Sequence, residues 1–232
     1  MREIVLDTET TGLVPGDGHR VVEIGAVELF NHVPTGRVFH TYVNPERDMP
    51  EDALQVHGLT SAFLAEQPCF AEVVEELLAF LDHDGNASPA PARLVIHNAE
   101  FDLAFLNSEL ARLGRPPLDG GYGVVNTLQI ARQRFPNAPN SLDALCRRFS
   151  VDGSARTRHG ALLDAELLAE CYLGLIGGRQ PDLGLVAMVA TSRVTVVRQR
   201  VARPPRPHAP SADELAAHAA FLEQLSNPVW RA

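Results

Sequence analysis

The sequence predicts an α/β fold in which a mixed five-stranded sheet is flanked by helices on both faces and followed by a C-terminal tail. Two observations predict this fold. Three strand-like segments joined by short turns come first, which indicates an antiparallel meander. Short apolar segments then alternate with helical patterns, which is typical of parallel strands covered by helices. Hydrophobic residues make up 45% of the 232 residues, enough for a substantial core.

The meander begins with the apolar run at residues 4–6, which leads directly into Asp7 and Glu9. Residues 20–29 and 36–43 are predicted to form the second and third strands. Side chains two residues apart on a strand point the same way, so the two carboxylates should project together. Close carboxylates repel each other, and a hard divalent cation would relieve that repulsion. The alternative is a solvated strand end that carries two acids by chance.

The rest of the fold is predicted from periodicity and capping signals. Asn98 is expected to cap a helix that begins at about Ala99, and Gly114 to end it. The predicted segments are a loop at 45–50, a helical turn at 61–64, a helix at 70–81, a surface loop at 83–92, a strand at 94–96, a helix at 99–113, a strand at 124–125, and helices at 127–135, 141–149 and from about 159 to 175.

Composition excludes several classes of protein. All 20 basic residues are arginine, so a phosphate-loop lysine, a Schiff-base lysine and a Ser-Lys dyad are excluded. Cys69, Cys146 and Cys171 match no disulfide framework or zinc pattern, which favours buried thiols in a reducing compartment. No apolar run approaches the ~20 residues needed to span a bilayer. The chain starts on an acidic strand rather than a signal peptide, so a cytoplasmic protein is expected.

Charge is distributed unevenly along the chain. Residues 1–175 carry 25 acidic residues and 13 arginines, whereas residues 176–232 carry 4 acidic residues and 7 arginines. An acidic body should bind nucleic acid weakly, because that binding rests on cations that neutralise phosphates. If the substrate is nucleic acid, bound metal and a tethering partner must supply the attraction.

Two further acidic motifs follow. Residues 97–102 read His-Asn-Ala-Glu-Phe-Asp and place Asp102 in the first turn of a helix, where the dipole favours a carboxylate. His159 and Asp164 are separated by about 140° on a helix, so they converge only if His159 lies in the preceding loop, with Gly160 permitting the bend. The alternatives are that Asp102 only complements the helix dipole and that His159 is an exposed loop residue.

Together, the spacings Asp7-x-Glu9, Asp102 after Asn98, and His159-x4-Asp164 resemble the three motifs of the DEDDh family of 3′–5′ exonucleases. That family has a ribonuclease H-like fold, in agreement with the sheet predicted above. The Val-His-Gly at 56–58 and the Asn-Ser-Leu-Asp-Ala-Leu at 140–145 strengthen the match. The sequence most resembles the proofreading subunits of bacterial replicative DNA polymerases, along nearly the whole chain.

The resemblance implies a role for each motif. Asp7, Glu9, Asp102 and Asp164 are expected to bind two divalent metal ions, Mg²⁺ or Mn²⁺, and His159 is expected to act as the general base. The family's pocket for the 3′-terminal nucleotide maps to Thr10, Thr11, Gly12, Leu13, Val56, His57, Asn98 and Phe101. Where many relatives have Asp-Thr-Leu, this chain has Asn126-Thr127-Leu128, which we expect to change a hydrogen bond near the metal ligands.

The resemblance divides the chain into an exonuclease domain at 1–178, a flexible linker at 179–210 and a polymerase-binding segment at 211–232. Ser211 and Glu214 form a capping box that starts a short helix. The resemblance implies that this segment docks on the α subunit of DNA polymerase III, and that residues 180–185 bind the sliding clamp. The alternatives are a chance linker sequence and a tryptophan that folds back on the body. The expected partner-binding residues are Gln180, Leu183, Leu185, Leu215, Leu222 and Trp230.

The sequence therefore predicts a metal-dependent 3′–5′ exonuclease that proofreads DNA and releases nucleoside 5′-monophosphates from the 3′ end of single-stranded or frayed DNA. Two alternatives remain open. One is a stand-alone RNA exonuclease of the same family, which the long tail disfavours. The other is an inactive structural subunit of a polymerase, which the complete set of motif residues disfavours.

Overall fold

The computed structural model describes residues 1–82, 92–153, 159–178 and 209–226, and it divides into two units, Met1–Pro181 and Asp182–Ala232. The first unit is built on a five-stranded sheet with the order β3-β2-β1-β4-β5. The elements are β1 (Arg2–Thr10), η1 (Pro15–Asp17), β2 (Val21–Phe30), β3 (Val33–Tyr42), α1 (Glu51–His57), α2 (Ser61–Ala65), α3 (Phe70–Asp82), β4 (Arg93–Ile96), α4 (Ala99–Arg112), η2 (Leu118–Gly120), β5 (Gly123–Asn126), α5 (Thr127–Arg134), α6 (Leu142–Phe149), α7 (Ala161–Leu175) and α8 (Ala212–Glu223).

The predicted mixed sheet is confirmed. β1, β2 and β3 form the antiparallel meander, and β4 and β5 run parallel to β1. β3 begins three residues earlier than predicted and contains Pro34 and Gly36. β3 is an edge strand, and an edge strand tolerates both residues because one side of its hydrogen-bonding ladder is unpaired.

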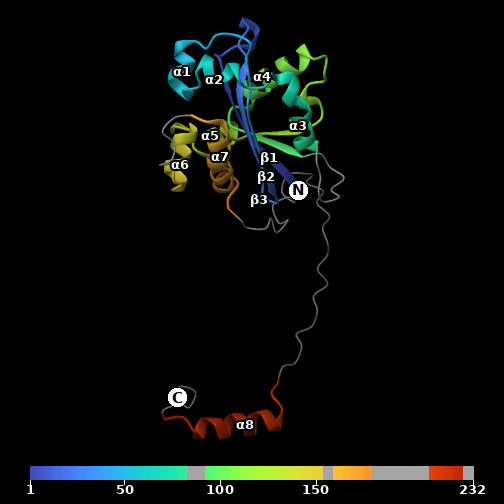
Figure 1. Ribbon diagram of the computed structural model, residues 1–232. Coiled ribbons are helices and arrows are strands. Elements are labelled where there is room, and N and C mark those ends of the chain that lie inside the picture. The colour runs from blue at the N-terminus through green and yellow to red at the C-terminus, as the bar shows by residue number, and fades with distance from the viewer. Residues whose placement is uncertain (83–91, 154–158, 179–208, 227–232) are drawn as a thin grey trace, which may run out of the picture. The chain divides into compact units, whose positions relative to one another are not determined.

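Helices cover both faces of the sheet and create two hydrophobic cores (Figure 1). Successive residues of β1 alternate between them: Ile4 and Leu6 pack with α3 and α4, whereas Val5 packs with α5, α6 and α7. This alternation buries the central strand on both sides, which explains its continuous apolar run.

Helix α7 lies unusually close to β2, and Gly25 makes that approach possible. A Cβ atom at Gly25 would lie 2.2 Å from the backbone nitrogen of Leu162, far inside normal contact distance. Gly25 is paired with Asp7 across the β1–β2 ladder. The close contact therefore places the first turn of α7 beside the carboxylate end of β1.

Several details differ from the sequence predictions. Helix α1 was not predicted, because its only buried residue is His57 and it therefore has no apolar stripe. Asn98 occupies the N-cap position of α4, but its φ of 71° turns the backbone left-handed and its side chain makes no capping hydrogen bond. Helix α6 begins at Leu142, one residue later than predicted, and Ser141 caps it. Cys69 is only partly buried, whereas Cys146 and Cys171 are buried.

Helix α8 belongs to the second unit. The predicted capping box is present: Ser211 Oγ accepts from the Glu214 amide, and the Glu214 side chain accepts from the Ser211 amide. Leu215 and Phe221 are each 54% exposed, and Leu222 is partly buried. The predicted contacts at Gln180, Leu183, Leu185 and Trp230, and most of the predicted loop at 83–92, lie outside the described residues.

Candidate active site

The site is positioned by the end of β1 that extends past its parallel neighbour. β4 pairs with β1 only opposite Glu3, Ile4 and Val5, so the next residues of β1 have β2 alone beside them. Asp7 and Glu9 lie in this extension, within the strand rather than after its end. Both side chains line a cavity of about 700 Å³. The prediction that they project together is confirmed.

Asp102 enters the same cavity from the first turn of α4 and is 2% exposed. Its Oδ1 accepts hydrogen bonds from the Thr8 amide (3.0 Å) and the Thr8 hydroxyl (2.6 Å). Burial raises the pKa of Asp102 to about 7, although the two hydrogen bonds from Thr8 act in the opposite direction. A buried carboxyl with this pKa is one that a bound cation would readily hold in its ionised form.

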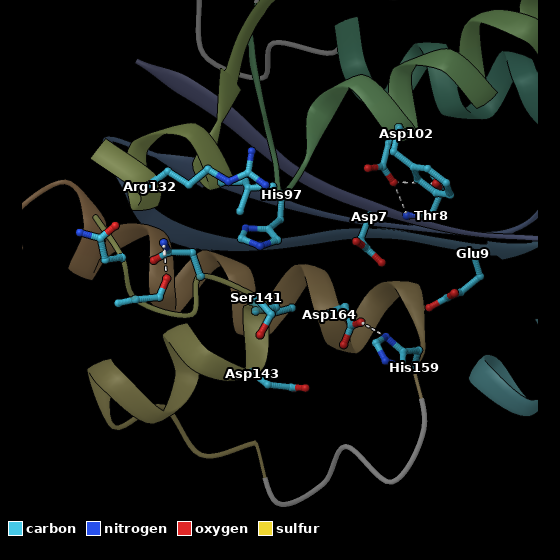
Figure 2. A pocket seen from close by; sticks show the side chains of 16 residues that line it. Asp7, Thr8, Glu9, His97, Asp102, Arg132, Ser141, Asp143, His159 and Asp164 are labelled. Carbon is cyan, nitrogen blue, oxygen red and sulfur yellow. Dashed lines mark hydrogen bonds and ion pairs between the residues drawn. The ribbon is translucent and has the colours of Figure 1, made fainter. Parts of the chain in front are cut away.

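Asp164 and His159 complete the group from the N-terminal end of α7 (Figure 2). His159 lies before the helix, as predicted, and Gly160 between them is extended with a φ of −155°. This bend brings His159 Nδ1 to 3.2 Å from Asp164 Oδ2. The His159 amide also donates to the Val56 carbonyl at 3.3 Å, which ties the loop to α1.

Glu9, His159 and Asp164 each offer one ligand atom, and these atoms lie within 4.8 Å of one another. Asp7 and Asp102 line the same cavity beside them, as Figure 2 shows. The structure therefore brings all five predicted motif residues to one place, from three separate segments of the chain. Oxygen-rich sites of this kind suit hard divalent cations.

A second cavity of about 560 Å³ shares Thr8, Glu9 and Phe101 with the first. It is lined by most of the residues that the resemblance assigns to the terminal nucleotide. Asn98 is the exception, because it is exposed and lines neither cavity. The predicted residues found there are Thr10, Thr11, Gly12, Leu13, Val56, His57 and Phe101.

A buried ion pair supports the loop that forms this second cavity. Arg20 Nε and Nη2 donate to the two carboxylate oxygens of Glu109 at 2.6 and 2.8 Å. The Arg20 amide and the Thr11 hydroxyl are joined at 3.0 Å, and the Thr11 amide donates to the Arg20 carbonyl at 2.9 Å. Glu109 lies on α4, so the loop is attached to the same helix that carries Asp102.

His19 and Gly12 shape the inner side of this loop. A Cβ atom at Gly12 would lie 2.3 Å from the His19 ring, so the ring packs directly on the glycine backbone. His19 Nδ1 is 3.1 Å from the Thr11 hydroxyl. His19 was not predicted as a site residue, because a single histidine in a loop carries no distinguishing pattern.

The opposite wall of the first cavity was also not predicted. It is formed by His97, which precedes α4, by Arg132 on α5, and by the start of α6. The sequence signals for this wall were His97, the first residue of the motif at 97–102, and the Asn-Ser-Leu-Asp-Ala-Leu segment at 140–145. The further lining residues are Leu128, Asn137, Ala138, Asn140, Ser141, Leu142 and Asp143.

Asn126 lies outside this set and serves a local structural role. Its Oδ1 accepts from the amides of Leu128 and Gln129 and so caps α5. Its Nδ2 donates to Glu100, which lies two residues before Asp102. The hydrogen bond near the carboxylates that Asn126 was predicted to change is therefore the one to Glu100.

Comparison with known proteins shows the family to which this chain belongs. A family model described as "Exonuclease" (RNase T) matches residues 4–172. The DNA polymerase III subunit epsilon of Rickettsia felis is 45% identical over 97% of both chains, and that of Salmonella typhimurium is 42% identical over 100% of this chain and 98% of its own. The chain belongs to the exonuclease family of the DNA polymerase III epsilon subunits.

Solved structures agree with this assignment at the level of the fold. The nuclease domain of 3′hExo, a DEDDh member bound to rAMP, has a TM-score of 0.63 at 19% identity and covers 75% of this chain and 91% of its own. Exonuclease X in complex with 5′-overhanging duplex DNA has a TM-score of 0.57 at 22% identity and covers 75% and 90%. The ribonuclease H-like exonuclease fold is confirmed, and this fold implies the use of divalent metal ions. No helix in the described part of the chain has the length and apolar character needed to cross a membrane.

Proposed function

We propose that this protein is the proofreading 3′–5′ exonuclease of a bacterial DNA polymerase III and releases nucleoside 5′-monophosphates from DNA 3′ ends. The observation that carries the proposal is the convergence of four carboxylates and His159 on one cavity. The epsilon relatives, whose lengths the chain matches, support the DNA polymerase III assignment.

The donor set fits two divalent metal ions, Mg²⁺ or Mn²⁺. The carboxylates of Asp7, Glu9, Asp102 and Asp164 supply only oxygen ligands, and three of these four side chains are buried. Burying several like charges together is unfavourable unless a cation balances them. When bound, a metal pair polarises the phosphate, lowers the pKa of the attacking water and stabilises the leaving 3′ oxygen.

His159 is placed to accept a proton from the attacking water. Its imidazole is half exposed and contacts Asp164 through Nδ1, so the ring lies beside the proposed metal ligands, where the attacking water would bind. At near-neutral pH an imidazole can accept a proton readily. A general base of this kind typically increases the rate by about 10²–10⁴-fold. The hydrogen bond from its amide to Val56 positions His159 relative to the second cavity, where the terminal nucleotide binds.

The second unit is proposed to hold the exonuclease on its polymerase. Helix α8 has 12 residues, and an isolated helix of that length is marginal in water, so a partner surface would stabilise it. We propose that residues 211–232 bind the α subunit of DNA polymerase III and that residues 180–185 bind the sliding clamp. Tethering raises the effective concentration of an acidic enzyme that binds DNA weakly.

The proposal is tested with the purified full chain on a primer–template with a mismatched 3′ end. Excision is expected to require Mg²⁺ or Mn²⁺, to stop with EDTA and to yield 5′-monophosphates. Removing residues 205–232 should spare hydrolysis of free oligonucleotides but abolish co-purification with the polymerase subunit. Faster hydrolysis of matched RNA than DNA would instead favour an RNA exonuclease, and no metal-dependent hydrolysis would favour an inactive structural subunit.

A further inference from the structure

Arg132 lies on the wall of the first cavity that is opposite the four proposed metal ligands. Among the described residues that line either cavity it is the only arginine, and it lies exposed on α5. Within the described part of the chain, its guanidinium forms no hydrogen bond or salt bridge. A cation at an acidic cavity that makes no internal ion pair is available to an anionic ligand.

The adjacent His97 does not compete for that role. Burial is the main cause that lowers the pKa of His97, and the charge of Arg132 lowers it further. A hydrogen bond with the Asn140 backbone raises the pKa of His97, but the net shift is downward and favours the neutral imidazole. Its Nδ1 lies 3.0 Å from the Thr127 hydroxyl. Figure 2 shows Arg132 and His97 side by side on this wall, and of the lining residues that the structure describes, Arg132 alone carries a permanent positive charge.

The two cavities define the path of a DNA strand if the proposed function holds, and the inference rests on that function. The cavities meet at Thr8, Glu9 and Phe101. With the terminal nucleotide in the second cavity and the scissile phosphate at the carboxylates, the preceding nucleotides must leave through the first cavity. Their phosphates then pass along the wall that carries Arg132.

We propose that Arg132 binds a phosphate of the DNA strand upstream of the scissile bond. A guanidinium presents a planar set of donors that matches two phosphate oxygens. The first turn of α5 is fixed by the Asn126 cap, so Arg132 projects from a rigid element. In a body with a large excess of acidic residues, this contact supplies attraction to a strand that enters a cavity lined by five carboxylates.

The test compares two substrates of the full-length protein. The p-nitrophenyl ester of thymidine 5′-monophosphate has the scissile phosphate but no upstream phosphate, whereas a single-stranded tetranucleotide has both. In Arg132→Gln, the ratio of kcat/KM for the tetranucleotide to kcat/KM for the ester should fall about tenfold, the loss expected of one charge-assisted contact. The matched control is Arg112→Gln, which removes an exposed arginine outside both cavities and should leave the ratio at the parent value.

A neutral methylphosphonate then locates the contact. Placed in turn at the first and second phosphates upstream of the scissile bond, it should lower the parent's kcat/KM about tenfold at one position and cause no further loss there in Arg132→Gln. The slope of log kcat/KM against log salt should also become shallower by about 0.7, as expected for one lost contact with single-stranded DNA.

Each outcome is decisive. An unchanged substrate ratio in Arg132→Gln, or additive losses at both methylphosphonate positions, overturns the assignment of Arg132. Equal losses on the ester and the tetranucleotide overturn it too, because they place the effect at the scissile centre. Failure of the parent to hydrolyse either substrate with metal present would instead reject the proposed function.

Discussion

The two cavities meet at Glu9, but different kinds of residues and different structural elements line them. On one side, the first is lined by carboxylates that project from β1, α4 and the start of α7, and three of these four carboxylates are buried. The second is lined largely by the loop after β1 and by α1, and several of its apolar residues are exposed: Leu13 is 80% and Val56 47% accessible. The proposed chemistry thus rests on the core, whereas the proposed recognition of the terminal nucleotide rests on a surface loop.

This difference predicts that substitutions should separate into two kinds. Changes to the five motif residues in the first cavity should reduce turnover of every substrate, because they remove proposed reacting groups. Changes in the second should raise KM and leave turnover of bound substrate nearly intact, because they affect ground-state and transition-state binding alike.

The largest effect is expected from Asp164→Asn. This nearly isosteric change removes a proposed metal ligand, so activity on ester and oligonucleotide should fall by more than the roughly 10²–10⁴ attributable to a general base. The metal-free protein should unfold at the same temperature or higher, because one buried negative charge is gone. Added Mn²⁺ should raise the melting temperature of the parent and raise that of the variant less.

Asp143→Asn is the matched control, since Asp143 lines the same cavity but is exposed and is not a proposed ligand. Its activity should stay near that of the parent. If the Asp164→Asn protein hydrolysed substrate at the parent rate, the assignment of Asp164 as a metal ligand would be wrong.

A second large effect is expected from Gly25→Ala, although this residue touches no substrate. The added methyl group would overlap the backbone of Ala161 and Leu162, so α7 must shift. Overpacking of this kind costs about 1–3 kcal/mol of folding free energy. Displacing Asp164 by about 1 Å should also reduce kcat about 10²-fold.

The control for this change is Gly120→Ala, where a Cβ atom meets nothing within 4 Å. Melting curves and kcat on the ester should show no change there. Normal kcat in Gly25→Ala would mean that α7 adjusts without moving its carboxylate.

Gly25 also illustrates what the sequence could not reveal. The acidic pair on β1, Asp102 in a first turn and His159 ahead of α7 were all predictable, because local spacing fixes the direction of a side chain. The approach of α7 to Gly25 and the pairing of Arg20 with Glu109 join residues far apart in the chain. Such contacts depend on how whole elements pack, and no local periodicity encodes them. Helix α1 was missed for a related reason, since it lacks a buried stripe.

A moderate effect confined to the second cavity is expected from Glu109→Gln. The ion pair with Arg20 is largely buried, and its hydrogen bonds raise the pKa of Arg20. Loss of the carboxylate should cost about 1–3 kcal/mol of stability, measured by urea denaturation. The loop that carries Thr11 should loosen, so KM for the ester should rise while kcat is maintained.

Glu75→Gln provides the comparison, because Glu75 pairs with Arg115 on the exposed surface. That pair should contribute about 0–1 kcal/mol, with no effect on KM. If kcat rather than KM changed in Glu109→Gln, the substitution would have altered the position of Asp102 on α4 rather than the loop that carries Thr11.

The smallest effect, and the sharpest for the comparison, is expected from Leu13→Ala. Because Leu13 is 80% exposed, its truncation should change stability by less than about 0.5 kcal/mol. If the side chain packs on the terminal base, the lost contact is worth about 0.8 kcal/mol per buried methylene, which corresponds to a several-fold rise in KM for the ester. Val38→Ala, on the exposed edge strand and outside both cavities, should alter neither quantity. A Leu13→Ala protein that lost stability but kept its KM would show that the loop residue supports the fold, and the division between a chemical cavity on the core and a surface recognition cavity would fail at that residue.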